Sequence, residues 1–173
     1  SSPVQIPGTT WDKAFGGYNN ILATKTDGTL WAIGDNAMGQ LGDNSRTDRS
    51  SPVQIPGTTW SSASINQSRG VGAIKTDGTL WMWGYGNSGS LGQNSIVSYS
   101  SPVQVPGSWS YYENAGDGAA GRKTDGTLWT WGENGYGRLG QNQAEAQIDK
   151  ISSPVQIPGT NWNRIAMSDR TAL

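Results

Sequence analysis

The sequence predicts an all-β protein made of β-propeller blades of about 50 residues each. The segment Ser-Pro-Val-Gln-Ile/Val-Pro-Gly begins four times, at Ser2, Ser51, Ser101 and Ser153, so that successive copies start 49, 50 and 52 residues apart. The chain has 25 glycines but only 34% hydrophobic residues, which is typical of short strands joined by tight turns. Three to four short strands per repeat favour a propeller blade, because the coils of a β-solenoid are usually shorter.

Together, the repeats over residues 1–173 are expected to form one partial propeller. We place three full repeats at 1–50, 51–100 and 101–152, and an incomplete fourth at 153–173. A closed ring of seven blades would require roughly 350 residues at this period. We therefore expect the sequence to be part of a longer, seven-bladed ring.

Each repeat starts with a proline-flanked segment. Ser2–Ile6 contains Pro3 and is followed by Pro7-Gly8, which predicts a turn. Because proline has no N–H group to donate to a ladder, Ser2–Ile6 is expected to be an edge strand or an extended connector. Trp11 follows, with Ala14 three residues later, and these residues predict the next strand.

A hairpin is the strongest local signal in the repeat. Thr26-Asp27-Gly28-Thr29 separates Ala23–Lys25 from Leu30–Ile33, and the motif returns at Asp77-Gly78 and Asp125-Gly126. Asp-Gly in this setting predicts a two-residue hairpin in which both central residues have positive φ. A lone carboxylate per turn lacks the ligand cluster that calcium requires, so we interpret these aspartates as turn residues.

A glycine-rich segment follows each hairpin, at 34–42, 84–92 and 132–140. No Gly-Lys-Ser/Thr and no helical periodicity follow these glycines, which argues against a phosphate-binding loop. We expect them at positions of positive φ or where two backbones pass closely.

Two segments carry a family resemblance. Lys-Thr-Asp-Gly-Thr-Leu-Trp-Met-Trp-Gly at 75–84 and Trp-Thr-Trp-Gly-Glu-Asn-Gly-Tyr-Gly-Arg-Leu-Gly at 129–140 resemble the regulator-of-chromosome-condensation repeat. The resemblance extends over the whole chain and implies a propeller that usually closes with seven blades. The histidine common before the family's hairpin is missing from the equivalent stretches 17–20, 67–70 and 116–119. This sequence has no counterpart of the insertion through which the founding member acts on a small GTPase, or of a basic histone-binding tail. We therefore do not infer nucleotide-exchange activity from the resemblance.

Composition excludes several function classes. The net charge is −1, with 12 basic and 13 acidic residues, which argues against nucleic acid as a partner. Cysteine and histidine are absent, so disulfides, histidine catalysis and zinc fingers are excluded, and we expect no metal or other cofactor. No apolar segment approaches the length of a membrane span.

Candidate binding residues lie in the segments that differ between repeats, since specificity in repeat scaffolds resides there. These segments follow the hairpins (35–38, 85–88, 133–136) or precede Pro-Val-Gln (43–50, 93–100, 141–152). The candidates are Met38, Tyr85, Tyr99, Tyr136 and Gln147. The alternative is that these residues merely fill blade junctions.

The repeated tryptophans have a structural interpretation. Trp31, Trp81 and Trp129 lie in the most regular strand, and we expect them, like Trp83 and Trp131, to pack in the core. A surface glycan would need aromatic residues in the variable loops, where only tyrosines occur.

We hypothesise a non-enzymatic interaction or structural module of a virion, tail fibre or cell-surface assembly, with protein partners or assembly neighbours. This hypothesis favours an extracellular or virion-surface location over a cytoplasmic one. The alternative is a regulatory propeller that binds a protein partner inside a cell. A glycosidase or lyase is a third hypothesis, which would need two converging carboxylates. Its candidates are Glu113, Asp117, Glu133 and Glu145.

Overall fold

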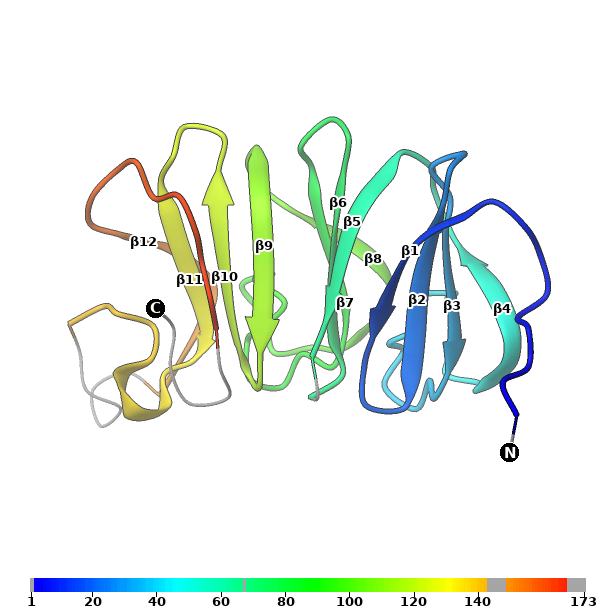
Figure 1. Cartoon of the computed structure of the whole chain (residues 1–173). Helices are drawn as coiled ribbons and strands as arrows, with labels where there is room; N and C mark the ends of the chain where they lie inside the picture. The colour runs from blue at the N-terminus through cyan, green and yellow to red at the C-terminus, as the bar shows by residue number, and fades with distance from the viewer. Residues whose placement is uncertain (1, 67, 143–148, 168–173) are drawn as a thin grey trace.

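The computed structural model describes residues 2–66, 68–142 and 149–167, and it consists of three four-stranded antiparallel sheets (Figure 1). The first blade contains β1 (Trp11–Gly16), β2 (Asn20–Lys25), β3 (Leu30–Gly34) and β4 (Arg49–Ile55). The second contains β5 (Trp60–Ile65), β6 (Gly70–Lys75), β7 (Leu80–Gly84) and β8 (Tyr99–Val105). The third contains β9 (Trp109–Ala115), β10 (Gly118–Lys123), β11 (Leu128–Glu133) and β12 (Lys150–Ile157). The prediction of all-β propeller blades is confirmed, whereas a ring of seven blades stays a prediction.

The fourth strand of each blade comes from the next sequence repeat. β4 contains the second copy of Ser-Pro-Val-Gln-Ile and pairs with β3, with Ile55 opposite Leu30. β8 and β12 contain the third and fourth copies and pair with β7 and β11 in the same way. The first copy, Ser2–Ile6, is not part of a described strand. Of the two alternatives for this segment, the second, third and fourth copies form the edge strand.

The hairpin has a different geometry from the one predicted. Lys25 N donates to Thr29 O and Gly28 N donates to Lys25 O, both at 2.9 Å, and Gly28 has a φ of 79°. Asp27 is not among the residues with positive φ, so the expectation of positive φ at both central residues is wrong. A β-turn followed by one left-handed glycine closes the hairpin instead.

The aspartate in this turn has the structural role that we inferred. Asp27 Oδ1 accepts hydrogen bonds from Thr29 N at 2.9 Å and Thr29 Oγ1 at 2.6 Å. The hydrogen bonds from Thr29, first the side-chain and then the backbone one, lower the pKa of Asp27. The same pair of bonds holds the equivalent turns of the second and third blades.

The core lies between the blades. Trp83 and Trp131 are fully buried, as expected, and each Nε1 donates to a backbone carbonyl of the preceding blade's loop, that of Gln40 at 3.0 Å and that of Ser90 at 2.8 Å. The remaining tryptophans of these strands (Trp31, Trp81 and Trp129) are only half-buried. Each has the ammonium of the hairpin lysine over its ring, 4.3, 4.6 and 3.7 Å from the centroid respectively.

The two blade junctions differ in which of the facing sheets supplies the larger side chain. Leu22 and Ala63 belong to the core between the first and second blades. At the next junction the equivalent positions hold Gly72 and Tyr112, as the strand registers show. A Cβ on Gly72 would lie only 2.2 Å from Tyr112 Cε1, so the large ring is accommodated because the facing residue has no side chain.

Candidate functional site

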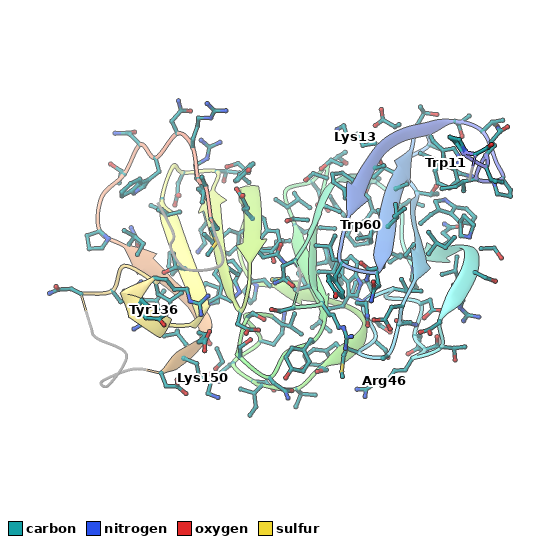
Figure 2. All side chains as sticks on the ribbon, turned by 60° about the horizontal axis from the view of Figure 1, so that its bottom comes forward. Trp11, Lys13, Arg46, Trp60, Tyr136 and Lys150 are labelled. Carbon is teal, nitrogen blue, oxygen red and sulfur yellow. The ribbon has the colours of Figure 1, made fainter. Side chains whose placement is uncertain are left out.

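The blades have two different edges. In Figure 1 the hairpins that join β2 to β3, β6 to β7 and β10 to β11 lie at the top. The turns from the first to the second strand, and the loops that follow the third strand, lie at the bottom. The repeats differ mostly in these lower segments, which we call the loop edge. Figure 2 shows Arg46, Tyr136 and Lys150 on this side, whereas Trp11 and Lys13 lie on the other.

One glycine per blade holds two loops of the loop edge together. Gly84 has a φ of 90°, and a Cβ there would lie 2.2 Å from Arg69 O. The next residue, Tyr85, donates its N–H to the same carbonyl at 3.1 Å. Gly34 and Gly132 occupy the same position in the other blades, which confirms the expectation of positive φ and close backbone approach. Each blade thus places two variable residues side by side: Asn19 with Asp35, Arg69 with Tyr85, and Asp117 with Glu133.

A hollow of about 410 Å³ opens on the loop edge. It is lined by residues from all three blades, namely Tyr18, Met38, Ser68, Arg69, Tyr85 and Asp117. Two tyrosines and a methionine provide apolar contact area, while the arginine and the aspartate provide one charge of each sign. Such a combination of aromatic, methionine and arginine side chains is typical of protein interfaces.

A smaller hollow of about 170 Å³ adjoins the first and shares Tyr85 and Asp117 with it. The residues that it adds are polar: Asn87, Ser88, Glu133, Asp149 and Lys150. Ser88 Oγ lies 3.1 Å from Asp117 Oδ1 and connects the second blade to the third. Glu133 forms an ion pair with Arg138 of its own loop. The loop edge therefore continues from an apolar hollow into a polar one.

An ion pair connects the first two blades at this edge. Arg69 Nε lies 3.4 Å from Asp35 Oδ2, and the two side chains are 36% and 19% exposed. A pair with this exposure contributes at most about 1 kcal/mol to stability because solvent screens it. The pair places the guanidinium of Arg69 beside Asp35 at the margin of the larger hollow.

The structure brings together only some of the residues predicted from sequence. Met38 and Tyr85 line the larger hollow, whereas Tyr99 lies on β8 and packs against the buried residues of both blade junctions. Tyr136 is 85% exposed and lines neither hollow. Gln147 lies outside the described residues. The binding role of these residues stays a prediction.

Sequence reasoning missed Tyr18 and Arg69. Both lie in the stretches where the family's usual histidine is replaced, and these stretches differ from repeat to repeat. That variation was the available signal, but a turn of three or four residues between strands gives no indication that its side chains face a hollow.

The candidate carboxylates do not form one cluster. Asp117 and Glu133 line the smaller hollow of the loop edge, while Glu113 lines a separate hollow formed by strands β1, β5, β6 and β9. Glu145 lies outside the described residues. Among the residues that the structure describes, no group of three or more acidic side chains is placed to hold a metal ion. The described part also has no helix of the length and apolarity that crossing a membrane requires.

Blades of four antiparallel strands that pack through tryptophans and repeat about every 50 residues define a tandem-repeat β-propeller. The family described as "Regulator of chromosome condensation (RCC1) repeat" matches residues 27–64, 77–114 and 125–169, which is more than half of the chain. The chain therefore belongs to the RCC1 repeat family. No curated protein sequence matches it significantly.

Solved propellers have the same fold. Yeast RCC1 (Prp20), in a crystal structure with Kap60 bound, superimposes with a TM-score of 0.79 at 15% identity, over 96% of this chain and 42% of that one. Human WBSCR16 gives a TM-score of 0.78 at 18% identity, over 96% and 46%. A second structure of Prp20p, from Saccharomyces cerevisiae, gives 0.74 at 16% identity, over 87% and 39%. This chain thus spans less than half the length of each of these propellers.

Proposed function

We propose that this chain is part of a regulatory, non-enzymatic propeller that binds a protein partner through its loop edge. The observation that carries the proposal is the hollow of about 410 Å³, to which three blades contribute side chains that differ from repeat to repeat. Tyr18, Met38 and Tyr85 are the contact residues that we propose. Large aromatic side chains in such hollows dominate the energy of protein interfaces.

The comparisons favour a protein partner over the other candidates. The matched yeast propellers bind proteins: Kap60 is bound in one structure, and the other concerns binding to Gsp1p and histones. None of the comparisons supports a virion, tail-fibre or adhesin role, or a glycan ligand. Our alternative hypothesis of a regulatory propeller therefore replaces the structural one as the main reading. The extracellular or virion-surface location stays a prediction without further support.

Site-specific crosslinking tests the proposal. A photoreactive amino acid is introduced at Tyr85 and, as a matched control, at Thr26, which is exposed on a hairpin at the opposite edge. Crosslinked proteins are identified by mass spectrometry and then purified, and their affinity for the unmodified chain is measured. Tyr85→Ala is expected to weaken binding at least about tenfold, as for an aromatic hot spot, and Thr26→Ala is expected to have no effect. Equal affinities of the two variants would contradict the proposal.

A further inference from the structure

A third hollow, of about 330 Å³, is formed by strands β1, β5, β6 and β9. It shares no residue with the two hollows of the loop edge. Phe15 on β1 and Tyr111 on β9 provide two aromatic side chains, and Glu113 provides a carboxylate. Tyr112 also lines the hollow, but it is only 7% exposed and its ring is stacked on Trp131. The rest of its lining comes from β5 and β6, mainly from small side chains such as those of Ser64 and Ala73. All three blades thus contribute to one aromatic hollow.

The strand registers show why these side chains share the hollow. Phe15 pairs with Leu22, Ser64 with Gly72 and Glu113 with Ala120, so Phe15, Ser64 and Glu113 occupy equivalent positions in successive blades. The first strands carry these residues, and β5 contacts both β1 and β9. The repeats differ completely at this position, although the hairpins around it are nearly identical. Core packing alone does not require an aromatic ring, a hydroxyl and a carboxylate at equivalent positions of three successive blades.

Among the residues that line the hollow, Glu113 carries a negative charge. Tyr111 donates its hydroxyl hydrogen to Glu113 Oε2 at 3.0 Å. Burial, and then this hydrogen bond, raise the pKa of Tyr111, so the phenol remains a neutral donor at physiological pH. Arg164 has the opposite effect on this pKa, which indicates that its positive charge acts on Tyr111 from nearby.

We propose that this hollow binds an organic ammonium group, such as the trimethylammonium group of choline or of an N-trimethylated lysine side chain. The faces of aromatic rings attract a cation within about 6 Å, and cages of such rings are the usual receptors for quaternary ammonium groups. Glu113 adds the opposite charge, and small apolar neighbours such as Ala73 replace the water around the methyl groups. The volume lies at the lower end of the range for ligand sites, which suits a compact cation.

Titration with a matched pair of probes tests the charge requirement. The intact chain is titrated with choline and with 3,3-dimethylbutan-1-ol, its neutral carbon isostere, and backbone amide shifts are followed by NMR. Choline is expected to bind and to shift the amides of Phe15, Ser64 and Tyr111, whereas the isostere binds at least about tenfold more weakly. Equal affinity for the two probes, or no shift of these amides with choline, would overturn the proposal.

Substitutions in the hollow test the individual contacts. Phe15→Leu and Glu113→Gln are each expected to weaken choline binding about 2- to 30-fold, the range that a cation–π or charge contact supports. Arg164→Gln is expected to strengthen binding because it removes a competing positive charge. Tyr136→Leu, which alters an exposed tyrosine outside the hollow, serves as the matched control. An equal loss in the control, or weaker binding in Arg164→Gln, would count against the site.

A peptide distinguishes the two sources of the ammonium group. A short glycine- and serine-rich peptide with one trimethyllysine is compared with the same peptide carrying unmodified lysine, and with choline. Tighter binding of the trimethylated peptide than of choline identifies a modified protein as the source, and tighter binding of choline identifies a small molecule. Tyr85→Ala should leave all of these affinities unchanged, so the outcome is independent of the function proposed for the loop edge.

Discussion

The contact between Gly72 and Tyr112 provides a quantitative test of how the blades recognise one another. Gly72→Leu places a side chain where a Cβ alone would lie 2.2 Å from the tyrosine ring, and overpacking of this kind costs about 1–3 kcal/mol. Tyr112 is only 7% exposed, so Tyr112→Ala removes a buried aromatic ring at a cost of about 3–5 kcal/mol. Each single variant should therefore be clearly destabilised.

The double variant Gly72→Leu/Tyr112→Ala recreates the pair Leu22 and Ala63 that occupies the first junction. The new leucine enters the space of the lost ring, so the two free-energy changes should not add. We expect the double variant to be more stable than their sum by about 2–3 kcal/mol, within the range known for residues in contact.

Urea unfolding followed by tryptophan fluorescence measures these free energies by linear extrapolation. Combining Gly72→Leu with Tyr136→Ala, which affects an exposed residue elsewhere, is the additive control. Additivity within about 0.5 kcal/mol in the Gly72/Tyr112 cycle would refute the reasoning, because it would mean that the two side chains do not share one space.

Three further changes have defined outcomes. Tyr112→Phe should leave the unfolding free energy unchanged or raise it by up to about 1 kcal/mol in urea titrations, since the buried hydroxyl has no hydrogen-bond partner among the described residues. Hydrogen bonds from the backbone and then the side chain of Thr79 lower the pKa of Asp77 below 3.8, so the stability from this carboxylate is present above that pH and is lost as the pH falls through the lowered pKa. The stability difference between wild type and Asp77→Asn should accordingly shrink between pH 5 and about pH 2. Gly84→Ala, at a φ of 90° and against Arg69 O, should lower the unfolding free energy by more than about 2 kcal/mol.

The sequence predicted part of the candidate site because the repeats can be compared with one another. Met38 and Tyr85 differ from their counterparts in otherwise similar segments, and both line the larger hollow of the loop edge. Tyr99 also differs, but it packs against the core because it lies on a strand, where the facing direction depends on the register. Arg69 reaches the hollow only because Gly84 brings two loops together, and such a contact between distant residues is not visible in a local pattern.

The sequence by itself determined the period, the hairpins and the positions of the turn glycines, since these depend on contacts between residues that are close along the chain. The tertiary structure decided the state of the proline-flanked segment. Ser51–Ile55 belongs to β4, and Ile55 is fully buried beside Leu30. The sequence left open whether such a segment is an edge strand or an extended connector, because its proline cannot donate to a ladder. A segment with a proline in its ladder has little intrinsic preference for a strand, so the neighbouring sheet edge determines whether one forms.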